Sequence, residues 1–227
     1  MAPRDDSLGD LFSRHLISKE VQASMVPGYL LRPLQPTDYE KGFLECLGHL
    51  TTVGEITKAQ FMDRFAYLKQ HNYEYFTIVI ENVQTSRIAA AGTVMVERKF
   101  IHQNGLVGHI EDIVSHPDAR GKNLGKAIID ALKHIGASVG CYKIILDCSE
   151  KNIPFYVKCG FSKQEYEMVR RSGSCLLLSV PPTHTRHVTD RSGAFLRATL
   201  PRSSEGRPAL DMRICDAICA YWSHLHL

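Results

Sequence analysis

Residues 108–126 constrain the fold of this chain more than any other segment. The segment begins as a strand whose centre carries Glu111 and Asp112 between β-branched residues. After a turn it becomes a basic loop with two glycines, and an amphipathic helix follows. Backbone N–H groups and the positive end of a helix dipole favour an anion at such a junction. Full positive charges are added by Arg120, Lys122 and Lys126. The segment therefore predicts a strand–loop–helix unit that holds a phosphate-bearing ligand.

The hydrophobic periodicity of the flanking sequence predicts further strands and helices. Residues 29–34 indicate an edge strand, because Pro33 has no N–H to donate to a ladder. Apolar residues recur at helical spacing over residues 39–50, after Thr57, after Gly121 and over residues 152–159. The other predicted strands are residues 75–83, residues 87–98 with Gly92 as a candidate bulge, residues 141–148 as a centrally buried strand, and residues 161–169 as a final strand. This order predicts a mixed sheet with helices on both faces, in the α/β or α+β class.

Composition excludes several classes of protein. The net charge of +3 in 227 residues is too small to indicate nucleic-acid binding. No apolar run reaches the roughly 18–20 residues that a membrane span needs, and the acidic residues near the N-terminus do not fit a secretory signal. Seven cysteines without a C-x-x-C pair indicate reduced thiols. We therefore expect a cytoplasmic protein that binds neither nucleic acid nor a membrane.

Composition also divides the chain into three parts. Residues 1–27 are expected to form a loosely held arm, with a short turn or two around Leu11 and Phe12 packing on the body. Residues 28–171 carry the periodic segments and form the predicted domain. Residues 172–227 are rich in Ser, Pro, Arg, Gly and His, so we expect a mostly flexible tail with one candidate terminal helix. The histidines and cysteines of the tail match no dependable zinc pattern, and we expect no metal.

Three segments of the predicted domain fit one pattern. They are the loop from Arg120 to Gly125, the strand end Leu146-Asp147-Cys148, and residues 152–161 with the sequence N-I-P-F-Y-V-K-C-G-F. Together they resemble the GCN5-related N-acetyltransferase (GNAT) superfamily, with its loop Arg/Gln-x-x-Gly-x-Gly/Ala and its downstream N-x-x-F-Y-x-x-x-G-F pattern. Asn123 takes the place of the middle glycine, so we expect Asn123 to adopt the left-handed backbone conformation that asparagine tolerates.

Four further blocks narrow the resemblance. Residues 50–54, 97–102, 108–112 and 140–148 are similar to blocks of the glucosamine 6-phosphate N-acetyltransferases and occur in their order. The similarity covers residues 28–171, and the tail departs from it. The resemblance implies the GNAT fold, with a mixed, mostly antiparallel sheet. It implies transfer of the acetyl group of acetyl-CoA to the amine of glucosamine 6-phosphate, on the route to UDP-N-acetylglucosamine. It also implies a homodimer that exchanges its last strand.

The resemblance implies site residues as well. A protonated amine must lose a proton before it attacks, and catalytic roles are implied for Asp147 on that proton, Tyr156 on the departing thiolate, and Glu111. The sugar phosphate is implied to contact Thr52, Lys99, Phe100, Ile101, His102, Glu111, Asp112, Ile113, Asp147 and Arg171, with Arg171 serving the partner's site. Acetyl-CoA is implied to contact Ile113, Val114, Ser115, Arg120, Gly121, Lys122, Asn123, Leu124, Gly125, Lys126, Asn152, Tyr156, Val157 and Lys158.

Each of these features also has an ordinary structural interpretation. The acidic pair could lie on an exposed strand face, the basic loop could be a solvated helix entry, Asp147 could cap a helix, and Tyr156 could belong to the core. Two other functions stay open. One is an N-acetyltransferase for another small amine, against which the cations Lys99, His102 and Arg171 argue. The other is a regulatory or inactive acetyl-CoA-binding isoform disabled by the tail.

Overall fold

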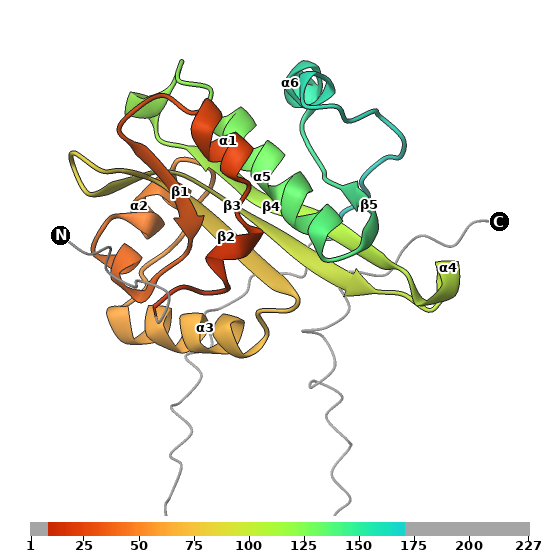
Figure 1. Ribbon diagram of the computed structural model, residues 1–227, viewed down its shortest axis with the longest axis horizontal. Helices are drawn as coiled ribbons and strands as arrows, with labels where there is room; N and C mark the ends of the chain where they lie inside the picture. Colours follow the sequence, from red (N-terminus) through yellow and green to blue (C-terminus); the bar gives the residue numbers. More distant parts are fainter. Residues whose placement is uncertain (1–8, 171–227) are drawn as a thin grey trace, which may run out of the picture. The chain divides into compact units, whose positions relative to one another are not determined.

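The computed structural model describes residues 9–170, in which helices cover a single sheet (Figure 1). The strands are β1 (Tyr29–Pro33), β2 (Tyr75–Asn82), β3 (Arg87–Arg98), β4 (Leu106–Ser115) and β5 (Cys141–Ile145), in that order across the sheet. β1 to β4 pair antiparallel, and β4 pairs with β5 in parallel. The predicted mixed, mostly antiparallel sheet is confirmed, in the α+β class. β1 is the predicted edge strand.

Helices lie on both faces of this sheet. They are α1 (Lys19–Ser24), α2 (Phe43–Gly48), α3 (Lys58–Gln70), α4 (Ile101–Asn104), α5 (Leu124–Ser138) and α6 (Ile153–Lys158), with short 3-10 turns η2 (Arg14–Leu16), η3 (Pro36–Tyr39), η4 (Pro117–Ala119) and η5 (Glu150–Asn152). α5 is the crossover that a parallel pair of strands requires. It packs on β2, β3, β4 and β5, and α1 lies beside it (Figure 1). α2 packs on β3 and β4 from the other face.

Local sequence determines where the helices begin and break. Oγ1 of Thr57 accepts a hydrogen bond from the N–H of Gln60 at 3.3 Å, and the Gln60 side chain accepts one from the N–H of Thr57 at 2.8 Å. This reciprocal pair is a capping box, and it starts α3 at the predicted position. The single helix predicted over residues 39–50 is wrong, because Gly42 adopts a left-handed φ of 81° and separates η3 from α2.

Two strand predictions are also wrong. Within the run of residues 141–148, Cys141–Ile145 form β5, and among the strands of residues 9–170 it pairs with β4 alone, at the edge of the sheet rather than at its centre. Tyr142 and Lys143 are exposed. Residues 161–170 have no regular structure, although residues 161–169 were expected to form a strand. A strand needs the backbone groups of a neighbour, and none of the strands within residues 9–170 pairs with this segment. The side chains of residues 162–170 are exposed, with Tyr166 78 % and Met168 86 % exposed.

The N-terminal segment belongs to the core from residue 9 onward. The short turn predicted to pack on the body around Leu11 and Phe12 is confirmed, because both side chains are buried and η2 follows them. The description as a loosely held arm does not apply to residues 9–17. The N–H of Leu11 donates to the carbonyl of Leu34 at 2.8 Å, and the rings of Phe12 and Phe76 meet edge to face at 5.2 Å. Arg171 and the predicted tail at residues 172–227 lie outside the described residues.

Candidate functional site

The site begins where β4 and β5 separate. Their parallel ladder ends at His109 and Ile145. β4 continues for six more residues, 110–115, and pairs there with β3 alone among the strands of residues 9–170. We call this stretch the free edge of β4. Glu111 has an interaction of its own within the chain, but no described strand pairs with residues 112–115 on the side away from β3. Backbone N–H and C=O groups on such a side need partners, so an extended ligand with amide groups can bind there as an added strand would.

A β-bulge at this edge turns the acidic pair. Glu111 faces Thr93, and Val114 faces Ala91, so two residues of β4 lie opposite the single residue Gly92. Asp112 takes the extra position with a left-handed φ of 55°. The sequence predicted the irregularity at Gly92, but the additional residue is on β4. Gly92 is required by space, because an added Cβ would lie 2.5 Å from Cδ1 of Ile113 and 2.6 Å from Cγ2 of Ile128.

The basic loop lies at the end of the free edge. We call residues 120–126 the pyrophosphate loop, after the ligand group that the sequence resemblance implies for them. Asn123 has φ 58° and ψ 21°, so the predicted left-handed asparagine is confirmed. Gly121 is also left-handed, with φ 79°. A Cβ added to Gly125 would lie 3.6 Å from Oγ of Ser115 and 3.6 Å from Cζ of Phe155. This glycine therefore marks the point where β4, the first turn of α5 and α6 converge.

Two cations of this loop, Lys122 and Lys126, have partners on the protein. Nζ of Lys122 donates to the carbonyl of Asp118 at 3.1 Å, and it lies 5.5 Å from the ring centre of Tyr29. The Lys126 ammonium pairs with the carboxylate of Asp130. Arg120 is exposed. The loop therefore brings positive charge to the N-terminus of a 15-residue helix, where an anion is favoured.

The predicted acid–base residues lie beyond β5. Asp147 is exposed, two residues after the end of the strand, and Tyr156 is half-buried on α6. Burial raises the pKa of the Tyr156 phenol, with smaller contributions from the thiols of Cys148 and Cys159. The phenol therefore stays protonated near neutral pH, as a proton donor must. On the opposite side, removal of surrounding water raises the pKa of Asp112, although part of the residue is exposed.

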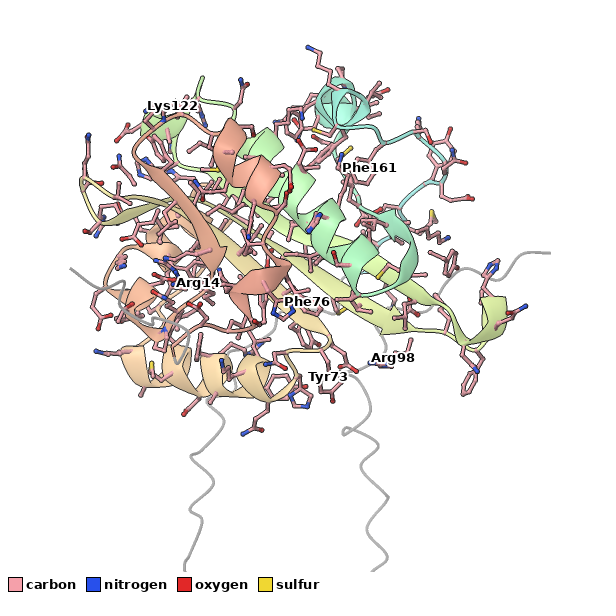
Figure 2. The ribbon with its side chains drawn as sticks, in the orientation of Figure 1. Arg14, Tyr73, Phe76, Arg98, Lys122 and Phe161 are labelled. Carbon is pink, nitrogen blue, oxygen red and sulfur yellow. The ribbon has the colours of Figure 1, made fainter. Side chains whose placement is uncertain are left out.

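The Tyr156 helix is connected to the body by few contacts. The Tyr156 ring lies edge to face with Phe161 at 6.3 Å, and the N–H of Phe161 donates to the Tyr156 carbonyl at 3.0 Å. Figure 2 shows Phe161 on the side of α6 that faces α5. The other predicted cofactor residues of this region, Asn152, Val157 and Lys158, are exposed.

Part of the predicted sugar site lies elsewhere. Lys99 to His102 join β3 to β4 and precede the first residue of β4, Leu106. Five residues of strand separate Leu106 from Glu111, roughly 17 Å. Figure 2 shows Arg98 and Lys122 at opposite ends of the structure, and Figure 1 shows α4 far from α6. Phe100 is 95 % exposed. The described residues of one chain therefore do not bring Lys99, Phe100, Ile101 and His102 to the acidic pair.

Lys99 is held by an ion pair of its own. Its Nζ lies 2.8 Å from Oε1 of Glu97, and Oε2 of Glu97 lies 2.9 Å from Nε2 of His109. Partial burial by itself would raise the pKa of Glu97, but the hydrogen bonds from Lys99 and His109 outweigh it and lower the pKa. Thr52 is exposed in the segment between α2 and α3.

Sequence reasoning missed two features of the site. The left-handed Asp112 depends on the register between β3 and β4, which no local pattern encodes. Lys133 on α5 donates to the carbonyl of Cys159 at 2.6 Å. The spacing of Lys126, Asp130 and Lys133 along α5 was the signal for a charged row on one helix face.

Three further features of residues 9–170 bear on the site. Two surface hollows, of about 230 and 460 Å³, are lined by none of the predicted site residues. No group of three His, Cys, Asp or Glu side chains there could hold a metal ion. Among the described helices, none has the length and apolar character needed to cross a bilayer.

Comparison with known proteins decides the family. The model of the acetyltransferase (GNAT) family matches residues 41–161, which contain the free edge, the pyrophosphate loop and α6. The chain belongs to the GNAT family. It is 50 % identical over 141 residues to glucosamine 6-phosphate N-acetyltransferase 1 of Dictyostelium discoideum, covering 62 % of this chain and 89 % of that protein.

Solved GNAT structures agree. The crystal structure of glucosamine-6-phosphate N-acetyltransferase from Arabidopsis thaliana superposes with a TM-score of 0.62 at 42 % identity, covering 63 % of this chain and 97 % of that one. An acetyltransferase of Trypanosoma brucei gives a TM-score of 0.59 at 38 % identity, covering 63 % and 99 %. GNAT acetyltransferases use acetyl-CoA as co-substrate, and the donors found here fit it, because an open strand edge suits an amide-containing arm and a basic helix N-terminus suits a pyrophosphate.

Proposed function

We propose that this protein transfers the acetyl group of acetyl-CoA to the amine of D-glucosamine 6-phosphate, giving N-acetyl-D-glucosamine 6-phosphate and CoA on the route to UDP-N-acetylglucosamine. The observation that carries the proposal is the free edge of β4, which ends at a basic helix N-terminus and has Glu111 and Asp112 at its bulge. Similarity to glucosamine 6-phosphate N-acetyltransferases of several eukaryotes supports the choice of sugar.

The cofactor side of the proposal assigns roles by position. Backbone groups of Ile113, Val114 and Ser115 pair with the pantetheine arm, because they lie on the free edge. The pyrophosphate loop, residues 120–126, binds the pyrophosphate. Asn152, Tyr156, Val157 and Lys158 line the side opposite β4. The thioester then lies near the bulge, where the two strands part.

The chemistry proposed is direct attack within a ternary complex. The ammonium of the sugar loses a proton to Asp147, directly or through a water molecule, while Glu111 and Asp112 orient it. The free amine attacks the thioester carbon, a C–N bond forms, and the C–S bond breaks. Backbone N–H groups of the free edge stabilise the developing oxyanion. The Tyr156 hydroxyl donates a proton to the departing thiolate, which agrees with its raised pKa.

The proposal includes a homodimer. Residues 161–170 carry exposed apolar side chains and have no strand partner within the described residues, as a strand donated to another chain would. A partner subunit also accounts for Lys99 to His102, which lie too far from Glu111 to serve the same site in one chain. Under this proposal, Thr52, Lys99 to His102 and Arg171 complete phosphate binding in the assembled dimer. We also propose a cytoplasmic location, in keeping with the free cysteines.

The decisive experiment compares the full chain with a chain that ends at Arg171. Thiol release from acetyl-CoA is measured with glucosamine 6-phosphate, with unphosphorylated glucosamine, and with a polyamine. We expect turnover that depends on the phosphorylated sugar. Absence of sugar-dependent turnover in both chains would overturn the proposal, and turnover with the polyamine alone would favour an acetyltransferase for another amine. Turnover only in the shortened chain would favour the regulatory isoform.

A further inference from the structure

A row of charged contacts runs along α5 from the pyrophosphate loop to the end of α6. Lys126, Asp130 and Lys133 are spaced by four and three residues, so their side chains share one face of the helix. The Lys126 ammonium contacts Oδ2 of Asp130, and Nζ of Lys133 lies 2.9 Å from Oδ1 of Asp130. Nζ of Lys133 also donates to the carbonyl oxygen of Cys159 at 2.6 Å. One carboxylate therefore binds both lysines, and one of these lysines reaches α6.

The bond to Cys159 is important because α6 is short and weakly buried. It has six residues, and none of the six, all within the described part of the chain, is buried. The last carbonyls of a helix lack intrahelical partners, and a cation at that end is favourable. Cys159 follows α6 directly and is buried. Lys133 therefore fixes the C-terminal end of α6 to α5 with a charge-assisted hydrogen bond.

We infer that Lys133 is a positioning residue, which holds α6 on α5 so that Tyr156 stays beside the free edge of β4, and that Asp130 links this contact to Lys126 in the pyrophosphate loop. The inference rests on the proposed function, because it concerns the proton donor of that reaction. In this inference Lys133 has no direct role toward either substrate. It acts through the backbone at Cys159, three residues beyond Tyr156.

Asp130 has the charge that this link needs. Partial burial alone would raise the pKa of its carboxyl, but hydrogen bonds from Lys126 and Lys133 outweigh burial and lower the pKa. Asp130 is therefore anionic at neutral pH. A bound pyrophosphate competes with Asp130 for the Lys126 ammonium. Asp130 also bonds to Lys133, so its carboxylate joins the pyrophosphate loop to the contact that fixes α6.

The first test requires no catalysis. Lys133→Met keeps the aliphatic stem and removes the donor, so hydrogen exchange at the amides of residues 156–161 should become faster. Lys133→Arg keeps a donor and should retain most of the protection. Lys58→Met removes an exposed ion pair with Glu40 at the start of α3 and is the matched control. Unchanged exchange at residues 156–161 in Lys133→Met would overturn the inference, whatever the reaction of the protein is.

The second test asks whether Lys133 acts through Tyr156. In the full chain, Lys133→Met should lower kcat by about tenfold, less than the 10²–10⁴-fold associated with a general acid, and leave the KM for the sugar within about twofold. In a Tyr156→Phe background the same substitution should cause no further loss. An acetyl thioester with a more acidic thiol should restore most of the rate, because its thiolate leaves without a proton.

The outcomes separate the two proposals. An inactive wild-type chain counts against the proposed function, and the exchange measurement then decides on Lys133 alone. An active wild-type chain in which the losses from Lys133→Met and Tyr156→Phe multiply counts against the positioning role. If Lys133→Met lowers kcat equally with acetyl-CoA and with the thioester of the more acidic thiol, that result also counts against the positioning role. Circular dichroism and the Lys133→Arg variant show whether a loss of rate comes from unfolding.

Discussion

Asp112 and Asn123, two residues of the site, hold left-handed backbone conformations, with φ of 55° and 58°. A non-glycine residue in this region costs roughly 1–3 kcal/mol and persists only where its surroundings enforce it. The sheet enforces Asp112, because β3 pairs on both sides of the bulge. The first turn of α5 follows Asn123, whose neighbour Leu124 is buried. Under the proposed function, the conformation of Asp112 orients the acidic pair, and that of Asn123 directs the loop N–H groups at the pyrophosphate.

Asp147 is the residue for which the proposed reaction makes the most direct prediction. Asp147→Asn keeps the size of the side chain but removes the proton acceptor and the charge that orients the ammonium. We expect kcat to fall by about 10²-fold or more, while the affinity for acetyl-CoA measured by calorimetry stays nearly unchanged. Asp63→Asn changes an exposed carboxylate of α3 and is the control. Unchanged turnover in Asp147→Asn would remove Asp147 from the mechanism.

At the scale of the elements, the bulge between β3 and β4 is the feature that brings fold and site together. It exists because Gly92 lets Ile113 and Ile128 approach the backbone of β3. The same contact packs α5 on the sheet, and the pyrophosphate loop leads into the first turn of α5. A shift of the β3 backbone at Gly92 would therefore move both the acidic pair and the N-terminal end of α5.

Gly92→Ala tests this arrangement. Its Cβ would lie within 2.6 Å of two isoleucine methyl groups, and we expect the free energy of unfolding to fall by about 1–3 kcal/mol. The KM for acetyl-CoA should rise as well. Gly48→Ala is the control, because no atom lies within 4 Å of its added Cβ and it lies within α2. Denaturant unfolding of both variants gives the comparison, and equal stability would refute the packing argument.

Sequence reasoning predicted the elements whose signals are local. The extended period predicted β3 at its observed bounds, the capping residue Thr57 placed α3, and Pro33 placed β1 at an edge. Sequence reasoning failed where the structure of a segment depends on which other segment pairs with it. Residues 141–148 are as apolar as a central strand, yet no second strand of the described residues pairs with β5. Residues 161–169 have the pattern of a strand but no described partner. The left-handed Asp112 depends on strand register, which was not predictable.

At the scale of the whole molecule, a buried ionic network holds the sheet to the segments around it. Arg32 of β1 is 2 % exposed; its guanidinium donates to Asp38 of η3 at 2.7 and 2.8 Å and to Glu81 of β2 at 2.6 and 3.0 Å. Lys41 also binds Glu81 at 2.9 Å. A buried charge that loses its partner is strongly destabilising. Three separate parts of the chain therefore depend on one guanidinium.

The network makes stability sensitive to acid. Burial by itself would raise the pKa of Glu81, but Lys41 and Arg32 outweigh it and lower the pKa below the ordinary value of 4.5. A carboxyl whose pKa is lower in the folded than in the unfolded chain stabilises the fold at a pH above its unfolded-state pKa. That contribution is lost as the pH falls through the folded-state pKa. At pH 7, Glu81→Gln should be roughly 3–5 kcal/mol less stable than the wild type. Below about pH 4.5, acidification should lower the stability of this variant less than that of the wild type. Urea unfolding measured over this pH range checks the prediction. An equal loss of the free energy of unfolding in the wild type and in Glu81→Gln would contradict it.

The proposed dimer is also a property of the whole molecule. Light scattering of the full chain should give twice the mass of one chain. Met168→Pro should shift the protein toward the monomer, because proline cannot donate to an inter-subunit ladder and Met168 is exposed within one chain. Met168→Ala keeps the N–H and is the control. A dimer that survives Met168→Pro would argue against strand exchange through this segment.

Under the proposed function, binding along the free edge of β4 makes the acetyl donor a structural component of the protein as well as a reactant. A ligand that binds only the folded state at 100 times its dissociation constant adds about 2.7 kcal/mol to stability. An empty strand edge, in contrast, is a template on which other chains can add and aggregate. Under the proposed function, the metabolic supply of acetyl-CoA therefore regulates not only how fast this enzyme works, but how much of it survives in the cell.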